Sequence, residues 1–238
     1  MRTAYTVFRN LYNVRKMTMK LVLASGSQRR RELLTMCGYD YEIIVSNADE
    51  TIDESDPESF VRALSFRKAK EVFDRLFAAG RREFAVIGSD TVVAFQKEGE
   101  AKPAIIGKPK DAEDAVRILS MLSGKTHRVF TGVSVIADIP DENAAAQCSI
   151  REKAEIQTEC SITEVTFETL SPDEITDYVN SGDPLDKAGS YGIQGPFGMF
   201  VREIRGNYFT VIGMPIPVLY KMLKKIGILP HGFYERIE

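Results

Sequence analysis

Short apolar runs alternate with capped helical segments along most of the chain, and this alternation restricts the fold to the mixed α/β class. Strands are expected at residues 21–24, 41–45, 84–87, 91–95, 128–137 and within 154–170. Helices are expected at residues 28–37, 57–79, 111–122 and 171–182, and after Pro217. We therefore predict a mixed sheet with flanking helices, arranged as two lobes around a central cleft, in which 128–137 and 154–170 form a long antiparallel pair.

Turn and capping residues set the limits of these elements. Residues 55–58 and 171–174 match the capping box, in which a serine and an acid three residues later satisfy the first N–H groups of a helix. The Gly-Ser-Asp sequence at 88–90 predicts a bend between two strands. The Arg-Gly-Asn sequence at 205–207 predicts a hairpin turn, with strands at 200–204 and 208–211.

Composition excludes several classes of protein. The chain has 238 residues, of which 44% are hydrophobic and 27% charged, values typical of a globular protein with a sizeable core. The net charge of −3 argues against binding nucleic acid or an anionic membrane through bulk charge. No apolar run approaches the roughly 20 residues that a membrane-spanning helix needs. Neither a membrane nor a nucleic-acid partner is expected.

Residues 1–20 are expected to form a leader ahead of one folded domain, residues 21–238. The leader contains five basic residues and no acidic one. Two interpretations stay open: a variable leader on a cytoplasmic protein, or an organelle-targeting segment. A further surface loop is expected at 138–149.

Cysteine and histidine are too sparse for a zinc site, a disulfide framework or a supported catalytic triad. The cysteines are Cys37, Cys148 and Cys160, and they are expected to be reduced and buried. Neither His127 nor His231 lies in a catalytic motif, and a structural role is expected for His127. Any catalysis must depend mainly on carboxylates, lysines and arginines.

The segment Ser-Gly-Ser-Gln-Arg-Arg-Arg-Glu at 25–32 joins a strand to a helix. The free N–H groups and dipole of a helix N-terminus bind anions. Ser25 and Ser27 add hydroxyl donors, and Arg29 and Arg30 add cations that match phosphate oxygens. Three arginines are unfavourable at the positive end of a helix unless a polyanion binds there. The alternative is an ordinary serine cap with solvated arginines.

Three further features suggest a site. Lys68 shares an apolar helix face with Leu64 and Val72, so it either extends to solvent or points into a site. Asp90 is expected at the exit of a strand, where α/β folds place ligands; it suits a metal ligand or a general base, or an ordinary turn residue. Lys108 lies in a Gly-Lys-Pro loop before a helix.

The segment 183–195 is rich in glycine, which allows a ligand to approach the backbone closely. Gln194 carries both amide donors and an amide acceptor, as needed to recognise a nucleobase. Asp186 and Lys187 are alternatively a local ion pair that orders this loop.

Together these segments resemble the Maf family of nucleoside triphosphate pyrophosphatases. The resemblance extends from about Leu21 to Lys224 and is carried by residues 23–34, 88–93, 107–109, 122–124, His127, 131–133 and 183–195. It implies the inosine-triphosphatase-like fold, a homodimer, and hydrolysis of a nucleoside triphosphate to the monophosphate and pyrophosphate. It also implies a divalent cation, Mg²⁺ or alternatively Mn²⁺ or Co²⁺. The family has been linked to inhibition of septum formation.

The resemblance also implies roles for individual residues. Asp90 matches the proposed general base and Glu50 a carboxylate associated with metal binding, so that Glu50 and Asp90 would hold the cation. Lys68 and Lys108 match functional lysines, and Arg30 matches a phosphate-contacting arginine. Gln28 departs from the family, which usually has proline there; because proline presets the first turn of a helix, we expect the loop to be less rigid and the activity to be retained.

Three positions separate the subfamilies, and Arg29, Thr91 and Gln194 match the type that acts on dTTP and UTP. Two alternatives remain. One is a regulator that binds nucleotide or RNA without hydrolysis, and the other is a pyrophosphatase for 7-methyl-GTP or damaged purine triphosphates.

Overall fold

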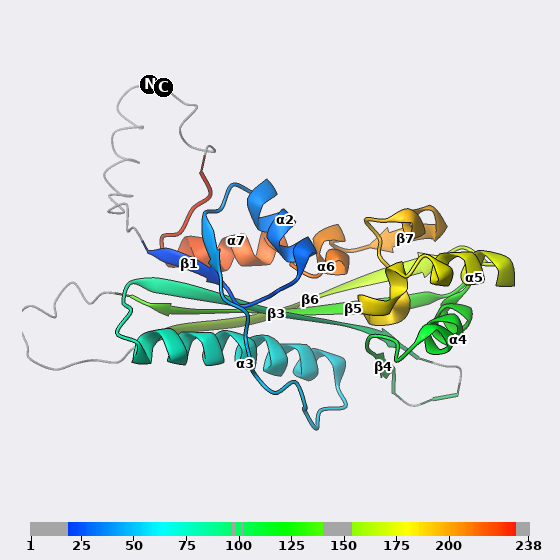
Figure 1. Cartoon of the computed structure of the whole chain (residues 1–238), viewed down its shortest axis with the longest axis horizontal. Coiled ribbons are helices and arrows are strands. Elements are labelled where there is room, and N and C mark those ends of the chain that lie inside the picture. Colours follow the sequence, from blue (N-terminus) through cyan, green and yellow to red (C-terminus); the bar gives the residue numbers. More distant parts are fainter. Residues whose placement is uncertain (1–18, 97–98, 101, 140–153, 232–238) are drawn as a thin grey trace, which may run out of the picture.

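A long, twisted, mixed sheet forms the centre of the computed structural model, which describes residues 19–96, 99–100, 102–139 and 154–231 (Figure 1). The strand order is β2-β1-β3-β5-β6-β7, and β4 pairs with β3. The strands are β1 (Lys20–Leu23), β2 (Tyr41–Ile43), β3 (Phe84–Phe95), β4 (Ala104–Ile106), β5 (Thr126–Asp138), β6 (Ala154–Phe167) and β7 (Val201–Arg205). The α-helices are α2 (Gln28–Met36), α3 (Pro57–Ala78), α4 (Ala112–Leu122), α5 (Pro172–Asn180), α6 (Tyr208–Ile212) and α7 (Ile216–Lys225). Short 3₁₀ segments are η2 (Asp183–Asp186), η3 (Ala188–Ser190) and η4 (Pro196–Phe200).

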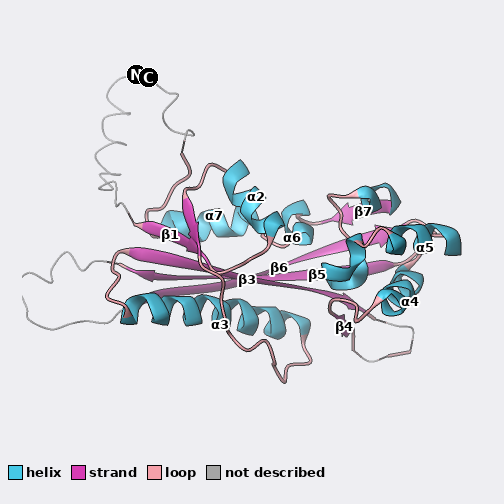
Figure 2. Cartoon of the chain, viewed as in Figure 1, coloured by secondary structure: helices cyan, strands magenta, loops and turns pink. Residues whose placement is uncertain are grey.

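Parallel pairing is confined to β1, which lies between β2 and the first half of β3. All other pairs among the described strands are antiparallel, including β5 with β6 over a register that extends from Thr126↔Thr166 to Asp138↔Ala154. The predicted mixed sheet with flanking helices is therefore confirmed, and so is the long antiparallel pair (Figure 2).

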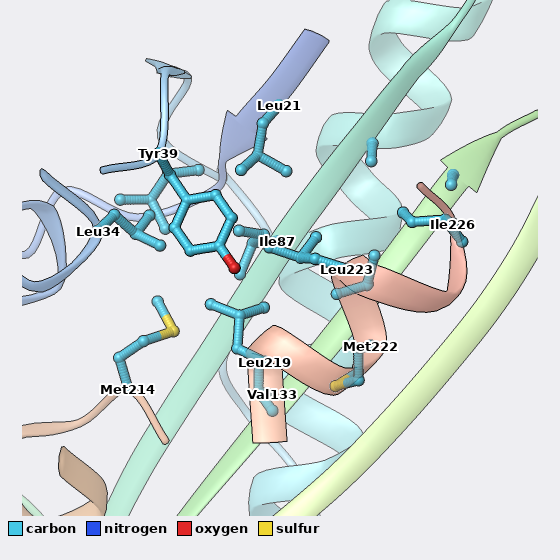
Figure 3. Close-up of a cluster of buried hydrophobic side chains, with 14 of the residues drawn as sticks. Leu21, Leu34, Tyr39, Ile87, Val133, Met214, Leu219, Met222, Leu223 and Ile226 are labelled. Carbon is cyan, nitrogen blue, oxygen red and sulfur yellow. The ribbon is translucent and has the colours of Figure 1, made fainter. Parts of the chain in front are cut away.

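Helices cover both faces of one end of the sheet. The alternation of β3 directs Ala85 and Ile87 toward α2 and α7, whereas Phe84 and Val86 pack with α3. Figure 3 shows side chains from α7, including Leu219, packed over the strands. At the other end, α4, α5 and the 3₁₀ segments enclose a separate apolar cluster, which corresponds to the predicted second lobe (Figure 1).

The predicted bend at 88–90 is wrong, because β3 continues without interruption from Phe84 to Phe95. Gly88 instead allows α3 to contact the sheet, since a Cβ at Gly88 would lie 2.1 Å from the carbonyl oxygen of Ser65. Gly132 on the adjacent β5 has the same role, since a Cβ there would lie only 2.2 Å from the carbonyl oxygen of Val61. Asp90 thus lies within a strand, just beyond the last register pair of β3 with β1 at Ile87.

The predicted hairpin at 205–207 is also wrong. After β7 the chain enters α6, whose first turn is capped by Asn207: its side-chain oxygen accepts a hydrogen bond from the N–H of Phe209. Asn207 therefore begins a helix rather than a second strand.

The remaining predicted elements agree with the structure in most details. The helix α3 is capped by Asp56 rather than by Ser55, and the capping box at Ser171 and Glu174 is confirmed. Strand β4 has no clear signal in the sequence. Nearly all of the leader 1–20 and most of the loop 138–149, including Cys148, lie outside the described residues. Among the described helices, none has the length and apolar character needed to cross a bilayer.

Candidate active site

The side chains of Glu50, Lys68 and Asp90 meet beside β3. The ammonium of Lys68 lies 2.8 Å from Asp90 Oδ1 and 3.0 Å from Glu50 Oε1. The side chains of Lys68 and Asp90 are each 12% exposed, whereas that of Glu50 is 66% exposed. Lys68 therefore points into a polar cluster and does not extend to solvent. The close approach of α3 to the sheet, made possible by Gly88, places Lys68 within reach of Asp90.

Arg30 is held in position by three neutral acceptors. Its Nε donates to the carbonyl oxygen of Gly213 at 2.9 Å, one terminal nitrogen donates to Ser25 Oγ at 3.1 Å, and the other donates to Thr91 Oγ1 at 3.4 Å. Desolvation lowers the pKa of Arg30 below its usual value, against the opposing effect of the Asp90 charge. A desolvated guanidinium without a carboxylate among these direct contacts is suited to an anionic ligand.

The N-terminus of α2 differs from those of α3, α4 and α5. Each of those three helices has a side-chain cap and an acidic residue in its first turn, whereas α2 has neither. Ser27 occupies the N-cap position of α2, and its N–H donates to Ser25 Oγ at 3.2 Å. The first-turn N–H groups of α2 are thus free of side-chain capping, as an anion-binding helix end requires.

Lys187 orders the glycine-rich loop. Its ammonium donates to the carbonyl oxygen and Oδ1 of Asp183 and to Oδ1 of Asp186. The hydroxyl of Tyr178 donates to Asp183 Oδ2 and accepts from the N–H of Gly192. The predicted local ion pair between Asp186 and Lys187 is confirmed.

Arg29 links α2 to the glycine-rich loop, which lies far away in the sequence. One of its terminal nitrogens lies 3.6 Å from Asp186 Oδ2. Gln194 lies further along the same loop and is exposed, with no hydrogen bond to its amide within the described part of the chain. Two of the predicted base-selecting residues are thus linked through one loop, while the third, Thr91, contacts Arg30.

Lys108 is exposed, and its ammonium makes no ion pair with the described residues. Its position is nevertheless connected to the glycine-rich loop, because the carbonyl oxygen of the preceding Gly107 accepts from the N–H of Gly189 at 3.0 Å. Among the predicted site residues, Ser27, Lys108 and Gln194 are therefore the three whose side chains have no polar partner in the part of the chain that the structure describes.

His127 is buried among aromatic side chains, which indicates a structural role. Its Nε2 lies 3.0 Å from the hydroxyl of Tyr191, and its ring packs edge-on against Phe167. Burial lowers the pKa of His127 to about 3, which keeps the ring neutral near pH 7.

Two supports of Arg30 have no clear signal in the sequence. The carbonyl oxygen of Gly213, after α6, accepts from both Arg30 and Ser89. Thr131, which belongs to one of the family motifs but has no predicted role, contacts Thr91 at 3.0 Å. These contacts join segments too far apart along the chain for any local pattern to indicate them.

The carboxylates of Glu50 and Asp90 suit a magnesium ion whose other ligands include phosphate oxygens of the substrate. No group of three or more His, Cys, Asp or Glu side chains within the described ranges has the geometry of a protein-only metal site. Glu50 and Asp90 nevertheless converge on the same ammonium, and Mg²⁺ in nucleotide enzymes commonly uses one or two carboxylates together with substrate phosphates.

Comparison with known proteins finds relatives that share one name. The chain is 40% identical over 217 residues to a dTTP/UTP pyrophosphatase of Agathobacter rectalis, covering 88% of this chain and 98% of the relative. It is 42% identical over 210 residues to a dTTP/UTP pyrophosphatase of Bacillus thuringiensis subsp. konkukian, covering 88% and 96%.

The solved structure of the Staphylococcus aureus Ham1 protein superimposes with a TM-score of 0.42 at 16% identity, over 87% of this chain and 98% of that one. A similarity at this level carries no functional information. The Maf-like protein family matches residues 20–226, which is most of the chain. The chain therefore belongs to the family of Maf-like proteins.

Proposed function

We propose that the protein hydrolyses dTTP and UTP to the monophosphate and pyrophosphate. The observation that carries this proposal is the convergence of Glu50, Lys68 and Asp90 in a chain whose relatives are named dTTP/UTP pyrophosphatases. Arg30 belongs to the same electrostatic environment, because its pKa responds to the charges of Asp90 and Glu50. Acidic and cationic groups together are expected of a site that both binds phosphates and promotes their hydrolysis.

The phosphates bind at the start of α2. A triphosphate carries about four negative charges near neutral pH, and positioning together with charge neutralisation supplies most of the catalysis of phosphoryl transfer. The uncapped N–H groups of α2, the guanidinium of Arg30 and the hydroxyls of Ser25 and Ser27 supply donors. Ser25 Oγ accepts from both Arg30 and Ser27, so its own proton is available to an anion.

Glu50 and Asp90 would hold a divalent cation, for which we propose Mg²⁺, with Mn²⁺ or Co²⁺ as alternatives. A bound cation supplies charge neutralisation on the phosphates and makes coordinated water more acidic. Lys68, which bridges the two carboxylates, keeps them close despite their mutual repulsion.

Asp90 acts as the general base. Water attacks the α-phosphorus while Asp90 accepts its proton, and the bond from that phosphorus to the bridging oxygen breaks, releasing pyrophosphate. Lys68, Arg30 and Lys108 stabilise the charge on the α-phosphate and on the departing group. Lys68 also fixes the orientation of the Asp90 carboxylate, since it donates to Oδ1 at 2.8 Å.

Arg29 and Gln194 select the base, whereas Thr91, the third position that separates the subfamilies, contacts Arg30. The exposed amide of Gln194 retains its donors and acceptor for a nucleobase edge. Arg29 is oriented by Asp186 of the same loop.

We also propose that the protein is a cytoplasmic homodimer. Light scattering at several protein concentrations tests the dimer, and cell fractionation tests the location.

A panel of triphosphates tests the activity, with pyrophosphate and orthophosphate detected separately. The panel contains dTTP, UTP, CTP, GTP and 7-methyl-GTP, each with Mg²⁺ and with chelator. Release of pyrophosphate from dTTP and UTP in preference to the others supports the proposal. Release of orthophosphate alone would indicate a phosphatase, and binding of dTTP without any release would indicate a nucleotide-binding regulator.

A further inference from the structure

A chain of hydrogen bonds leads from Arg30 into the interior of the protein. One terminal nitrogen of Arg30 contacts Thr91 Oγ1 at 3.4 Å, Thr91 Oγ1 contacts Thr131 Oγ1 at 3.0 Å, and Thr131 Oγ1 donates to the carbonyl oxygen of Thr210 at 2.7 Å. Thr131 is completely buried on β5, and Thr91 is half-buried opposite it on β3. The side chains therefore connect the phosphate-binding arginine to the backbone of α6.

The direction of every bond in this chain is determined by its two ends. A carbonyl oxygen only accepts, so the single hydroxyl proton of Thr131 is committed to Thr210. The bond between the two threonines must then run from Thr91 to Thr131, which commits the only hydroxyl proton of Thr91. Thr91 Oγ1 is left as an acceptor, and the guanidinium of Arg30, which only donates, uses it. Bonds aligned in one direction polarise and strengthen one another.

The same contacts leave Arg30 with a specific pair of donors. Arginine has five N–H groups, one on Nε and two on each terminal nitrogen. Gly213, Ser25 and Thr91 each accept from a different nitrogen of Arg30. One N–H therefore remains on each terminal nitrogen, as bidentate recognition of a phosphate requires.

We propose that Thr131 is a positioning residue for the substrate phosphates. By accepting the proton of Thr91, Thr131 fixes Thr91 as a hydrogen-bond acceptor for Arg30 and so orients the two remaining donors of the guanidinium. Thr91 accordingly acts through Arg30 on the phosphates that all triphosphates share, and not as a donor to the pyrimidine base. This inference rests on the proposed pyrophosphatase function and adds a residue to its phosphate site.

The test compares Thr131→Val, which removes the hydroxyl, with Thr131→Ser, which keeps it. Thr163→Val is the matched control, because Thr163 is a buried threonine on the adjacent β6 whose hydroxyl donates to the carbonyl oxygen of Asn207. Initial rates of pyrophosphate release are measured with dTTP, UTP and GTP, and folding is followed by thermal unfolding. Calorimetric titration with inorganic tripolyphosphate gives a readout that does not need hydrolysis.

We expect Thr131→Val to lower kcat/KM about tenfold, and by the same factor for every triphosphate, as loss of one oriented hydrogen bond to a charged group predicts. Affinity for tripolyphosphate falls with it. Thr131→Ser and Thr163→Val stay within about twofold of the wild type, although Thr163→Val loses thermal stability. Should Thr131→Val fail to fold, Thr91→Val breaks the same chain one residue earlier and is expected to give the same uniform loss.

Two results would overturn the inference. One is a Thr131→Ser variant as impaired as Thr131→Val, which would mean that packing and not the hydroxyl matters. The other is a changed ratio of dTTP to GTP turnover, which would mean that the threonines act on the base. A wild-type protein that binds tripolyphosphate but releases no pyrophosphate would refute the proposed function alone, because the effect of Thr131→Val on that affinity still tests the positioning.

Discussion

The carbonyl oxygen of Ser65 faces Gly88 so closely that a Cβ at position 88 would lie 2.1 Å from it. This contact sets how closely α3 packs against β3. Lys68 lies one turn after Ser65 on α3, and Asp90 lies two residues after Gly88 on β3. The close packing therefore brings the ammonium of Lys68 within hydrogen-bond distance of Asp90. A backbone contact between a helix and a strand therefore determines whether the charged cluster can form.

Replacing Gly88 with alanine should separate α3 from β3. We expect Gly88→Ala to lower the free energy of unfolding by about 3 kcal/mol, the upper part of the range for overpacking, because the obstructing atom is backbone and cannot rotate away. Gly107→Ala is the control: its Cβ would meet nothing within 4 Å, and a change below about 0.5 kcal/mol is expected. Urea unfolding measures both, and a Gly88→Ala variant as stable as the control would contradict the predicted clash.

Substituting Asp90 tests the assigned general base. Asp90→Asn keeps the shape of the side chain but cannot accept the proton, so pyrophosphate release should fall by about 10²–10⁴-fold while the protein remains folded. Asp74→Asn, which affects an exposed pair with Lys70 on the outer part of α3, should leave the rate unchanged. Rates are followed by coupled detection of pyrophosphate. Turnover by Asp90→Asn at the wild-type rate would exclude Asp90 as the base.

Removing the ammonium of Lys187 should loosen the glycine-rich loop. Lys187→Met deprives both Asp183 and Asp186 of their shared donor, and a loss of about 1–3 kcal/mol in the free energy of unfolding is expected, together with a higher KM for dTTP. Lys70→Met removes an exposed ion pair and should cost less than about 1 kcal/mol. Denaturant titration and steady-state kinetics measure the two effects; an unchanged KM would show that loop order does not limit substrate binding.

His127 should make the protein less stable in mild acid. Burial lowers its pKa from 6.5 to about 3, so between these values the unfolded chain binds a proton that the folded protein does not. The stability contributed by neutral His127 is therefore complete above about pH 6.5 and is lost as the pH falls, by up to about 1.4 kcal/mol per pH unit. Urea unfolding at about pH 5 and about pH 7.5, on either side of the ordinary histidine pKa, measures the difference. His127→Gln should have a smaller pH dependence than the wild type, and an identical dependence would contradict the prediction.

The two wrong turn predictions, at 88–90 and 205–207, have the same physical origin. A Gly-Ser-Asp sequence suggests a turn when judged from its neighbours alone, but Gly88 is needed because α3, an earlier segment of the chain, lies against the strand. Likewise, Tyr208–Ile212 has the composition of a strand and becomes α6 because Asn207 caps it and the carbonyl oxygen of Thr210 accepts a hydrogen bond from Thr131. In both cases contacts formed on folding outweigh local propensity.

For the site, the functional residues were easier to predict than the residues that form hydrogen bonds with them. The resemblance to a family pointed to Glu50, Lys68 and Asp90, and the structure brings both carboxylates into contact with the ammonium of Lys68. It did not indicate Thr131 or Gly213 as supports of Arg30, and it did not reveal that Thr91 has no hydroxyl proton left to donate.

By itself the sequence determined the features that depend on neighbouring residues: the capping box at Ser171, the end of α2 at Gly38, and the apolar periodicity of α4. These are short-range because caps and helix faces involve residues only three or four positions apart. The tertiary structure alone decided where Lys68 points and how Arg30 is held. Arg30 and Gly213 are 183 residues apart, and only the packing of α2 and α6 against one sheet brings a donor and an acceptor with no local relationship within 2.9 Å.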